Sequence, residues 1–371
     1  MNETANPFLV YGYINPDYFC DRETETEKLI SSLKNGRMVT LMSPRRMGKT
    51  GLIKNVFYHI KRNNPAAECF YLDIYSTNCL RDFVQVLART VLGEMDSFTQ
   101  KAINFLKSCR LVFSADPISG SPQASLDFQA SQTEVTLREI FDYLEQSGKE
   151  CFVAIDEFQQ ITEYPEKGTE ALLRSYIQFL PHVHFSFSGS KQHMMDSIFS
   201  SPRRPFYRVT ERMTLSPIPE NSYYLFASGW MKKGNKEIPK ELFGDIYQRF
   251  EGHTWFMQYV LNKLYEQSNE TITKENVARC IKEIVMMDID TYQQQYNMLT
   301  ENQRALLKAI AKEGTVTSIN ASAFINRYQL KGTSSVNTAL KNLTDNEFVY
   351  HSLKGYQVYD RFMALWLQTL P

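Results

Sequence analysis

The sequence is short of most features that would place it in a special class. No apolar run approaches the ~18 residues of a membrane span, and Met1–Pro7 lacks the basic and apolar stretches of a signal peptide. Six cysteines are scattered among 371 residues without a C-x-x-C pair, so neither a zinc site nor a disulfide framework is predicted. We therefore expect reduced core cysteines, no membrane partner and a cytoplasmic location.

An excess of charge of either sign is also missing. The 41 Lys and Arg residues balance the 41 Asp and Glu residues, so no global field directs the chain toward nucleic acid or a membrane surface. A hydrophobic fraction of 43% is ordinary for a soluble protein. The length exceeds that of one typical domain and predicts two or three.

One stretch carries a chemical pattern, an apolar run followed by a tight turn and a helix at residues 38–60. That order suits a phosphate-binding loop, in which backbone N–H groups face an anion and Lys49 adds a full charge. Thr50 would offer a hydroxyl to Mg²⁺. The usual motif has glycine where Ser43 stands, at a turn that a Cβ disfavours. The predicted loop comprises Ser43, Pro44, Arg45, Arg46, Met47, Gly48, Lys49, Thr50 and Gly51.

Apolar segments alternate with helical patterns as far as about residue 216. Five strand-like segments predict an α/β fold with a parallel five-stranded sheet. Asp156 and Glu157 end the third segment and Ser188 lies near the end of the fourth, at the sheet edge where ligands of such folds bind. A Ser/Pro-rich stretch at residues 114–125 is predicted to be an exposed loop or a flexible insert. The five segments lie at residues 38–42, 69–75, 151–157, 183–190 and 212–215.

Beyond residue 216 the pattern becomes helical. Four helical patterns precede residue 297, and the last of them covers residues 274–291. Three helix-sized segments (301–311, 321–328 and 334–344) then precede two extended pieces (348–352 and 356–359), which is the outline of a winged helix. We predict an α/β domain at 1–216, a helical lid at 217–296 and a winged-helix domain at 297–371.

Residues 43–50, the run 152–157, the segment 19–25 and this C-terminal part together resemble the archaeal-type P-loop ATPases of the AAA+/STAND division, including members from Bacteroidetes. The resemblance implies binding of ATP or ADP with Mg²⁺. Lys49 would hold the β- and γ-phosphates, Thr50 and Asp156 the metal, and Glu157 the attacking water. The alternative for the two carboxylates is a solvated strand end. Ser188 matches a polar sensor position, and Ser190 is a second candidate for it. The alternative for either serine is that it caps the helix that follows.

The resemblance implies further roles for residues outside the loop. Phe19 and Arg22 would line the adenine pocket, although Asp21 stands where glycine is usual and a helix start capped by Asp21 fits equally well. An arginine at 203, 204 or 208 would reach the γ-phosphate of the nucleotide bound to a neighbouring copy of the chain. Arg208 is the first choice and Arg204 the second. The alternative is that these arginines form a solvated turn. The segment Gly252-His253-Thr254 is a weak match to a nucleotide sensor.

The function predicted from these residues is that of a Mg-dependent ATPase acting as a nucleotide-driven switch, with a possible homo-oligomer joined by an arginine supplied in trans. One alternative is a DNA-binding regulator gated by nucleotide, and another is a scaffold that binds nucleotide without hydrolysis. From Thr300 onward eight basic residues face five acidic ones, a net charge of +3. The presumed recognition helix carries only Lys341, so a protein partner is as well supported as DNA.

Overall fold

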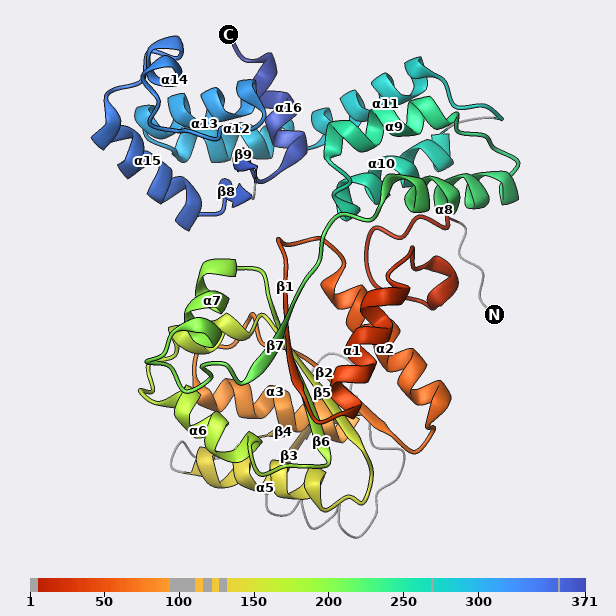
Figure 1. Ribbon diagram of the computed structural model, residues 1–371, viewed down its shortest axis with the longest axis vertical. Coiled ribbons are helices and arrows are strands. Elements are labelled where there is room, and N and C mark those ends of the chain that lie inside the picture. The colour runs from red at the N-terminus through yellow and green to blue at the C-terminus, as the bar shows by residue number, and fades with distance from the viewer. Residues whose placement is uncertain (1–5, 94–110, 116–121, 127–131, 268–269, 353) are drawn as a thin grey trace. The chain divides into compact units, whose positions relative to one another are not determined.

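The structure, a computed structural model, describes residues 6–93, 111–115, 122–126, 132–267, 270–352 and 354–371 (Figure 1). The chain forms two compact units. One, here called the sheet unit, holds residues 9–223 together with 253–255; the other, the helical unit, holds residues 6–8, 224–252 and 256–371. The division into three domains at residues 216 and 296 stays a prediction.

The sheet unit is built on five parallel strands in the order β2-β5-β6-β1-β7 (Figure 1). This confirms the predicted five-stranded parallel sheet. Asp73 is opposite Asp156, and Met42 is opposite Gly189, so polar strand ends meet at one edge. The strands are β1 (Met38–Met42), β2 (Glu68–Asp73), β5 (Cys151–Asp156), β6 (Val183–Gly189) and β7 (Thr210–Thr214).

Helices cover both faces of this sheet. Side chains alternate along β5: Phe152 and Ala154 join the core with α1 (Glu23–Lys34) and α2 (Lys49–Asn63), whereas Val153 and Ile155 join the core of the opposite face. Since both faces are buried, the strand is apolar up to Asp156 at its end. The opposite face is covered by α3 (Leu80–Gly93), α5 (Thr133–Glu145), α6 (Thr169–Ile177) and α7 (Gln192–Ser200), and a short 3-10 helix, η3 (Phe158–Glu163), follows β5.

Two local predictions for this unit are wrong. The stretch 114–125, predicted as an exposed loop, contributes to an antiparallel pair formed by β3 (Leu111–Ala115) and β4 (Pro122–Leu126); residues 116–121 lie outside the described part. Pro122 opens its strand, where the missing N–H costs least, so a Pro-rich composition is compatible with a strand there. Asp21 does not cap α1: the cap position is Arg22, with no side-chain cap hydrogen bond.

The helical unit starts with five helices, α8 to α12. Its N-terminal piece is held by Phe8, whose ring packs edge-on against Phe226 and Tyr265. The helix predicted over 274–291 is divided, because α11 ends at Met287 and a new helix begins after Asp288. The bounds are α8 (Glu220–Lys233, which begins in the sheet unit), α9 (Lys240–Phe250), α10 (Thr254–Gln267, whose first two residues belong to the sheet unit), α11 (Lys274–Met287) and α12 (Ile289–Met298).

The C-terminal part of the helical unit is a winged helix. A capping box between Thr300 and Gln303 starts its first helix. The three predicted helices and the hairpin are present, and a further helix, α16 (Arg361–Thr369), buries Phe362 and Trp366. The remaining elements are α13 (Glu301–Glu313), α14 (Ser322–Arg327), α15 (Thr333–Asp345), β8 (Val349–Ser352) and β9 (Gly355–Val358). Among the described residues, no helix is long and apolar enough to cross a membrane.

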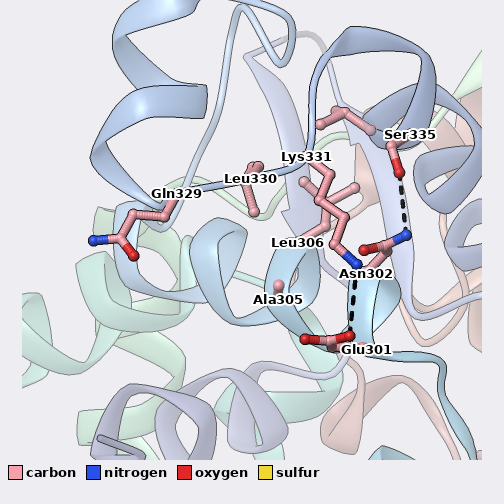
Figure 2. A pocket seen from close by; sticks show the side chains of 9 residues that line it. Glu301, Asn302, Ala305, Leu306, Gln329, Leu330, Lys331 and Ser335 are labelled. Atoms are coloured by element: carbon pink, nitrogen blue, oxygen red, sulfur yellow. Dashed lines mark hydrogen bonds and ion pairs between the residues drawn. The ribbon is translucent and has the colours of Figure 1, made fainter.

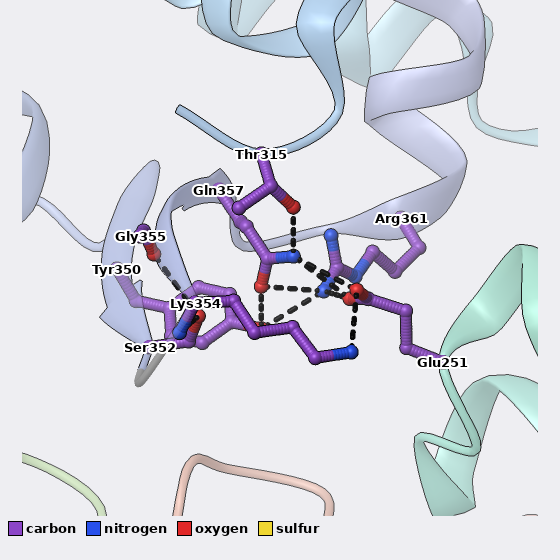
Figure 3. Close-up of polar contacts among 8 residues, drawn as sticks. All are labelled: Glu251, Thr315, Tyr350, Ser352, Lys354, Gly355, Gln357 and Arg361. Atoms are coloured by element: carbon purple, nitrogen blue, oxygen red, sulfur yellow. Dashed lines mark hydrogen bonds and ion pairs between the residues drawn. The ribbon is translucent and has the colours of Figure 1, made fainter. Parts of the chain in front are cut away.

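A polar cluster joins the wing hairpin to the end of α9 (Figure 3). The carboxylate of Glu251 accepts a hydrogen bond from Gln357 Nε2 at 2.9 Å and forms an ion pair with Arg361 Nη2. Lys354 Nζ lies 3.7 Å from Glu251 Oε1. The Arg361 side chain is only 11% exposed. Arg361 also donates to the Tyr350 hydroxyl at 2.8 Å. This cluster therefore fixes the hairpin to the C-terminal end of α9 within the same unit.

A small cavity lies at the start of α15 (Figure 2). It measures about 70 Å³, and Lys331 forms an ion pair with Glu301 at its rim, at 3.6 Å. Asn302 donates to the Ser335 hydroxyl at 3.1 Å. The volume suits a few water molecules at most.

Candidate functional site

The loop between β1 and α2 turns sharply at two residues with a left-handed backbone. Arg46 (φ 64°) and Gly48 (φ 90°) adopt the left-handed conformation, whereas Ser43 is not among the described residues with positive φ. The Cβ of Ser43 is therefore tolerated, and the expected strain at this position is absent. Ser43 is fully buried, and its hydroxyl donates to the carbonyl of Pro44 at 3.1 Å.

Lys49 is the first residue of α2 and its side chain reaches back across the loop. Its Nζ donates to the carbonyl oxygens of Ser43 at 2.9 Å and Pro44 at 3.1 Å. The residue is 6% exposed. Burial lowers the pKa of Lys49, an effect that the carboxylates of Asp156 and Glu157 oppose. An anionic phosphate near this amine would add favourable charge in the same way.

Asp156 ends β5 and is surrounded by hydrogen-bond donors. Its Oδ1 accepts from the Ser188 hydroxyl at 2.5 Å and from the backbone N–H of Glu157 at 3.0 Å. Its Oδ2 accepts from the Tyr71 hydroxyl at 2.6 Å and from Thr50 Oγ1 at 3.1 Å. Burial and the adjacent Asp156 raise the pKa of Tyr71, so its phenol stays protonated and donates. The structure thus brings together the predicted residues Thr50, Asp156 and Ser188.

Glu157 follows in the left-handed conformation (φ 56°). Its Oε2 accepts from the Ser190 hydroxyl at 2.8 Å and from Gln159 Nε2 at 2.5 Å. Arg45 of the loop donates to the same Ser190 oxygen at 3.3 Å. The two rival serines therefore contact different carboxylates, Ser188 that of Asp156 and Ser190 that of Glu157, and the sensor role stays a prediction for both.

Of the two residues predicted to line an adenine pocket, only Phe19 lies against the loop. A Cβ placed on Gly51 would be 2.9 Å from Phe19 Cε2, so the ring rests on the start of α2. Arg22 donates instead to the Ser216 carbonyl at 2.6 Å and to Glu25 at 2.7 Å. Its guanidinium is engaged in holding the segment before α1.

The interactions recorded for Arg204 and Arg208 are with residues other than those of the β1–α2 loop. Arg204 forms an ion pair with Glu170 at 2.5 Å within its own chain. Arg208 is exposed, has a φ of 53°, and lies over the ring of Tyr207, 5.3 Å from its centroid. Arg203 is exposed. Whether one of them acts on a neighbouring copy stays a prediction.

Three contacts at this site escape sequence reasoning. The Tyr71 hydroxyl donates to Asp156, the Gln159 amide donates to Glu157, and the backbone N–H of Trp255 donates to the Arg46 carbonyl at 3.1 Å. The Arg46 guanidinium also lies 4.0 Å above the Trp255 ring. The hydroxyl of Tyr71, between the apolar residues Phe70 and Leu72 of β2, was the available sequence signal.

The segment weakly matched to a nucleotide sensor belongs to the same neighbourhood. Thr254 Oγ1 lies 3.5 Å from the Met47 carbonyl, and Tyr223 donates to the Thr254 carbonyl at 3.2 Å. Residues 253–255 thus belong to the sheet unit and contact the loop. Their proposed sensing role is untested by these contacts.

The oxygen donors present fit Mg²⁺ better than a transition metal. No group of three or more His, Cys, Asp and Glu side chains able to hold a metal occurs in the described part of the chain. Thr50 and Asp156 offer hard oxygen atoms 3.1 Å apart. Mg²⁺ is characteristically bound by one or two such groups together with water and phosphate oxygens.

Taken with the winged helix, this sheet and loop define the class: the fold is that of a P-loop ATPase with a C-terminal winged-helix domain. The family described as a probable winged helix domain matches residues 290–369. A Walker-type ATPase of Pyrococcus abyssi is similar over 98% of this chain and 99% of its own, with a TM-score of 0.66 and 17% identity.

Two further solved structures show the same likeness. The Orc2 protein of Aeropyrum pernix, in complexes with ADPNP and ADP, is 15% identical over 93% of this chain and 91% of its own, with a TM-score of 0.59. The Orc1 protein of the same organism, in complex with DNA, is 12% identical over 98% and 96%, with a TM-score of 0.54. None of the curated protein sequences compared with the chain matches it. Membership of the STAND division and kinship with Bacteroidetes proteins stay predictions.

Proposed function

We propose that this protein is a Mg-dependent ATPase that works as a nucleotide-driven conformational switch. The observation that carries the proposal is the convergence of Lys49, Thr50, Asp156 and Glu157 on one edge of the sheet, beside a loop suited to an anion. ATP or ADP is the proposed ligand. The solved structures that are similar over nearly the whole chain include one described as a Walker-type ATPase and one with ADPNP and ADP.

Each of these residues has a defined task in the proposed reaction. Lys49 neutralises phosphate charge, and the loop N–H groups orient the phosphates. Thr50 and Asp156 would hold Mg²⁺, which supplies charge neutralisation on the phosphate oxygens. The carboxylate of Glu157 first moves away from its present partners Ser190 and Gln159, and then accepts a hydrogen bond from the attacking water. Phe19, resting on Gly51, is proposed to contact the adenine.

The first test is the binding and hydrolysis of ATP by Lys49→Ala. Loss of the ammonium removes a charge-assisted contact, so we expect ATP affinity or turnover to fall at least tenfold. Lys61→Ala is the matched control, because Lys61 is an exposed lysine near the end of the same helix. Unchanged affinity and turnover in Lys49→Ala would overturn the proposal.

Glu157→Gln separates hydrolysis from simple binding. The amide cannot take the role of the carboxylate toward water, so turnover should fall by a factor of ~10² or more while ATP affinity holds. Glu163→Gln, at an exposed position of η3, serves as control. If wild-type turnover is no faster than that of Glu157→Gln, the protein is a nucleotide-binding scaffold.

We also propose that an arginine of the 203–208 turn completes the site of a neighbouring copy, with Arg208 first because its guanidinium is exposed and Arg204 is paired with Glu170. Sizing of the protein with ADP and with a non-hydrolysable ATP analogue tests this. Assembly with the analogue alone, lost in Arg208→Ala, is the expected result. A monomer in both states rejects the role.

The winged helix supports a second candidate function, a DNA-binding regulator gated by nucleotide. In the described part of this domain, the basic residues do not form a strong positive surface for DNA. Four of them each contact a carboxylate of their own unit: Arg327, Lys331, Lys354 and Arg361. Such pairing leaves fewer cations for phosphates, which weakens the case for DNA. A duplex shift by the wild-type protein that weakens with salt and with Lys341→Gln would support DNA instead.

A further inference from the structure

All the acceptor capacity of the Asp156 carboxylate is in use. Two carboxylate oxygens provide about four lone-pair sites. Ser188 and the Glu157 N–H fill the two sites of Oδ1, and Tyr71 and Thr50 fill those of Oδ2. A metal ion, or a water bound to it, can therefore reach Asp156 only if one of these donors gives way.

The four donors differ in how easily they can leave. The Glu157 N–H is part of the backbone, and Ser188 is 1% exposed within β6. Thr50 can keep donating its proton to Asp156 while a lone pair of the same oxygen faces a metal. Tyr71, only partly buried on β2, is the remaining donor.

We propose that Tyr71 is a positioning residue that competes with metal-bound water for Oδ2 of Asp156 and thereby weakens metal binding at the proposed nucleotide site. The inference rests on the proposed function and adds a residue to it. In the absence of metal the phenol fixes the carboxylate beside Thr50. With a metal bound, a water ligand of that metal would donate to Oδ2 in place of the Tyr71 phenol.

Tyr71→Phe isolates the hydroxyl. Lys54 Nζ lies 4.4 Å from the centre of the Tyr71 ring, a contact that phenylalanine keeps. A hydrogen bond to a charged group, at the lower end of its usual strength, corresponds to about a tenfold change in an equilibrium constant, so removing the competitor should tighten metal binding about tenfold. Tyr75→Phe is the matched control, since Tyr75 lies just after β2 and its ring faces Arg45.

The experiment is a titration of the ADP-bound full-length protein with Mn²⁺, followed by the electron paramagnetic resonance signal of free Mn²⁺. Binding of ADP without metal is measured in parallel, and melting curves check folding. The expected result is a lower Mn²⁺ dissociation constant in Tyr71→Phe alone, with metal-free ADP affinity within twofold of wild type. A structural role for Tyr71 would not separate these two affinities.

The outcomes are distinct. An unchanged or raised Mn²⁺ dissociation constant in Tyr71→Phe overturns the competition, while the proposed function stands. If the wild-type protein binds no ADP, or binds no Mn²⁺ in its presence, the proposed function fails and this inference fails with it. A parallel change in Tyr75→Phe also rejects the specific role of Tyr71.

Discussion

Glu251→Gln should measurably destabilise the helical unit. The substitution keeps the size of the side chain and removes the charge that faces Arg361, whose side chain is 11% exposed. A hydrogen bond to a charged group contributes about 1.5–3 kcal/mol, and breaking a fully buried pair costs about 3–5 kcal/mol. Because the Glu251 side chain is 30% exposed, we expect a loss of about 2 kcal/mol, within the lower of these ranges.

Scanning calorimetry converts that loss into a temperature. For a unit of roughly 150 residues, 1 kcal/mol corresponds to about 2–4 °C, so the transition of the helical unit should fall by about 4–8 °C. Glu266→Gln is the control, since its pair with Lys263 has a glutamate 60% exposed and should contribute at most about 1 kcal/mol. The double variant Glu251→Gln/Arg361→Met should lose less stability than the sum of the losses in the two single variants. A Glu251→Gln transition within 1 °C of wild type would refute the reasoning.

Two further substitutions probe the proposed site. In Gly189→Ala the new Cβ would lie 2.3 Å from Gln159 Oε1 and 2.6 Å from Met195 Sδ, so both side chains must move; we expect a loss of about 1–3 kcal/mol in a denaturant titration, and unchanged stability would mean that both are free to shift. In Trp255→Ala the ring beneath Arg46 is lost, and ATP affinity should fall a few-fold by fluorescent-nucleotide titration. Trp230→Ala, which removes a similar ring from Lys233 in the helical unit, should leave affinity unchanged.

Features encoded by neighbouring residues were predictable from the sequence. The strand, loop and helix around Lys49 form one continuous stretch, and the buried strand before Asp156 is apolar on both faces. Parallel strand ends meet at one edge whatever their order, so the proximity of Lys49 to Asp156 follows from the alternation alone. The hairpin and first three helices of the winged helix have equally local signals.

Features that depend on contacts between distant residues were not predictable. Tyr71 and Asp156 are 85 residues apart, and their contact depends on which strand neighbours β2. The break at Asp288 is hidden because helical spacing continues across it. Serines 188 and 190 have the same chemistry, and only the placement of the two carboxylates tells them apart.

The three residues 253–255, which belong to the sheet unit although helices of the other unit precede and follow them, have a consequence for synthesis. Arg46 is translated about 200 residues before Trp255. At ~5–20 residues per second, roughly 10–40 s separate the two. Throughout that interval the nascent β1–α2 loop lacks its contact with Trp255, so the sheet unit completes its native contacts only after the ribosome has produced α8 and α9 of the helical unit.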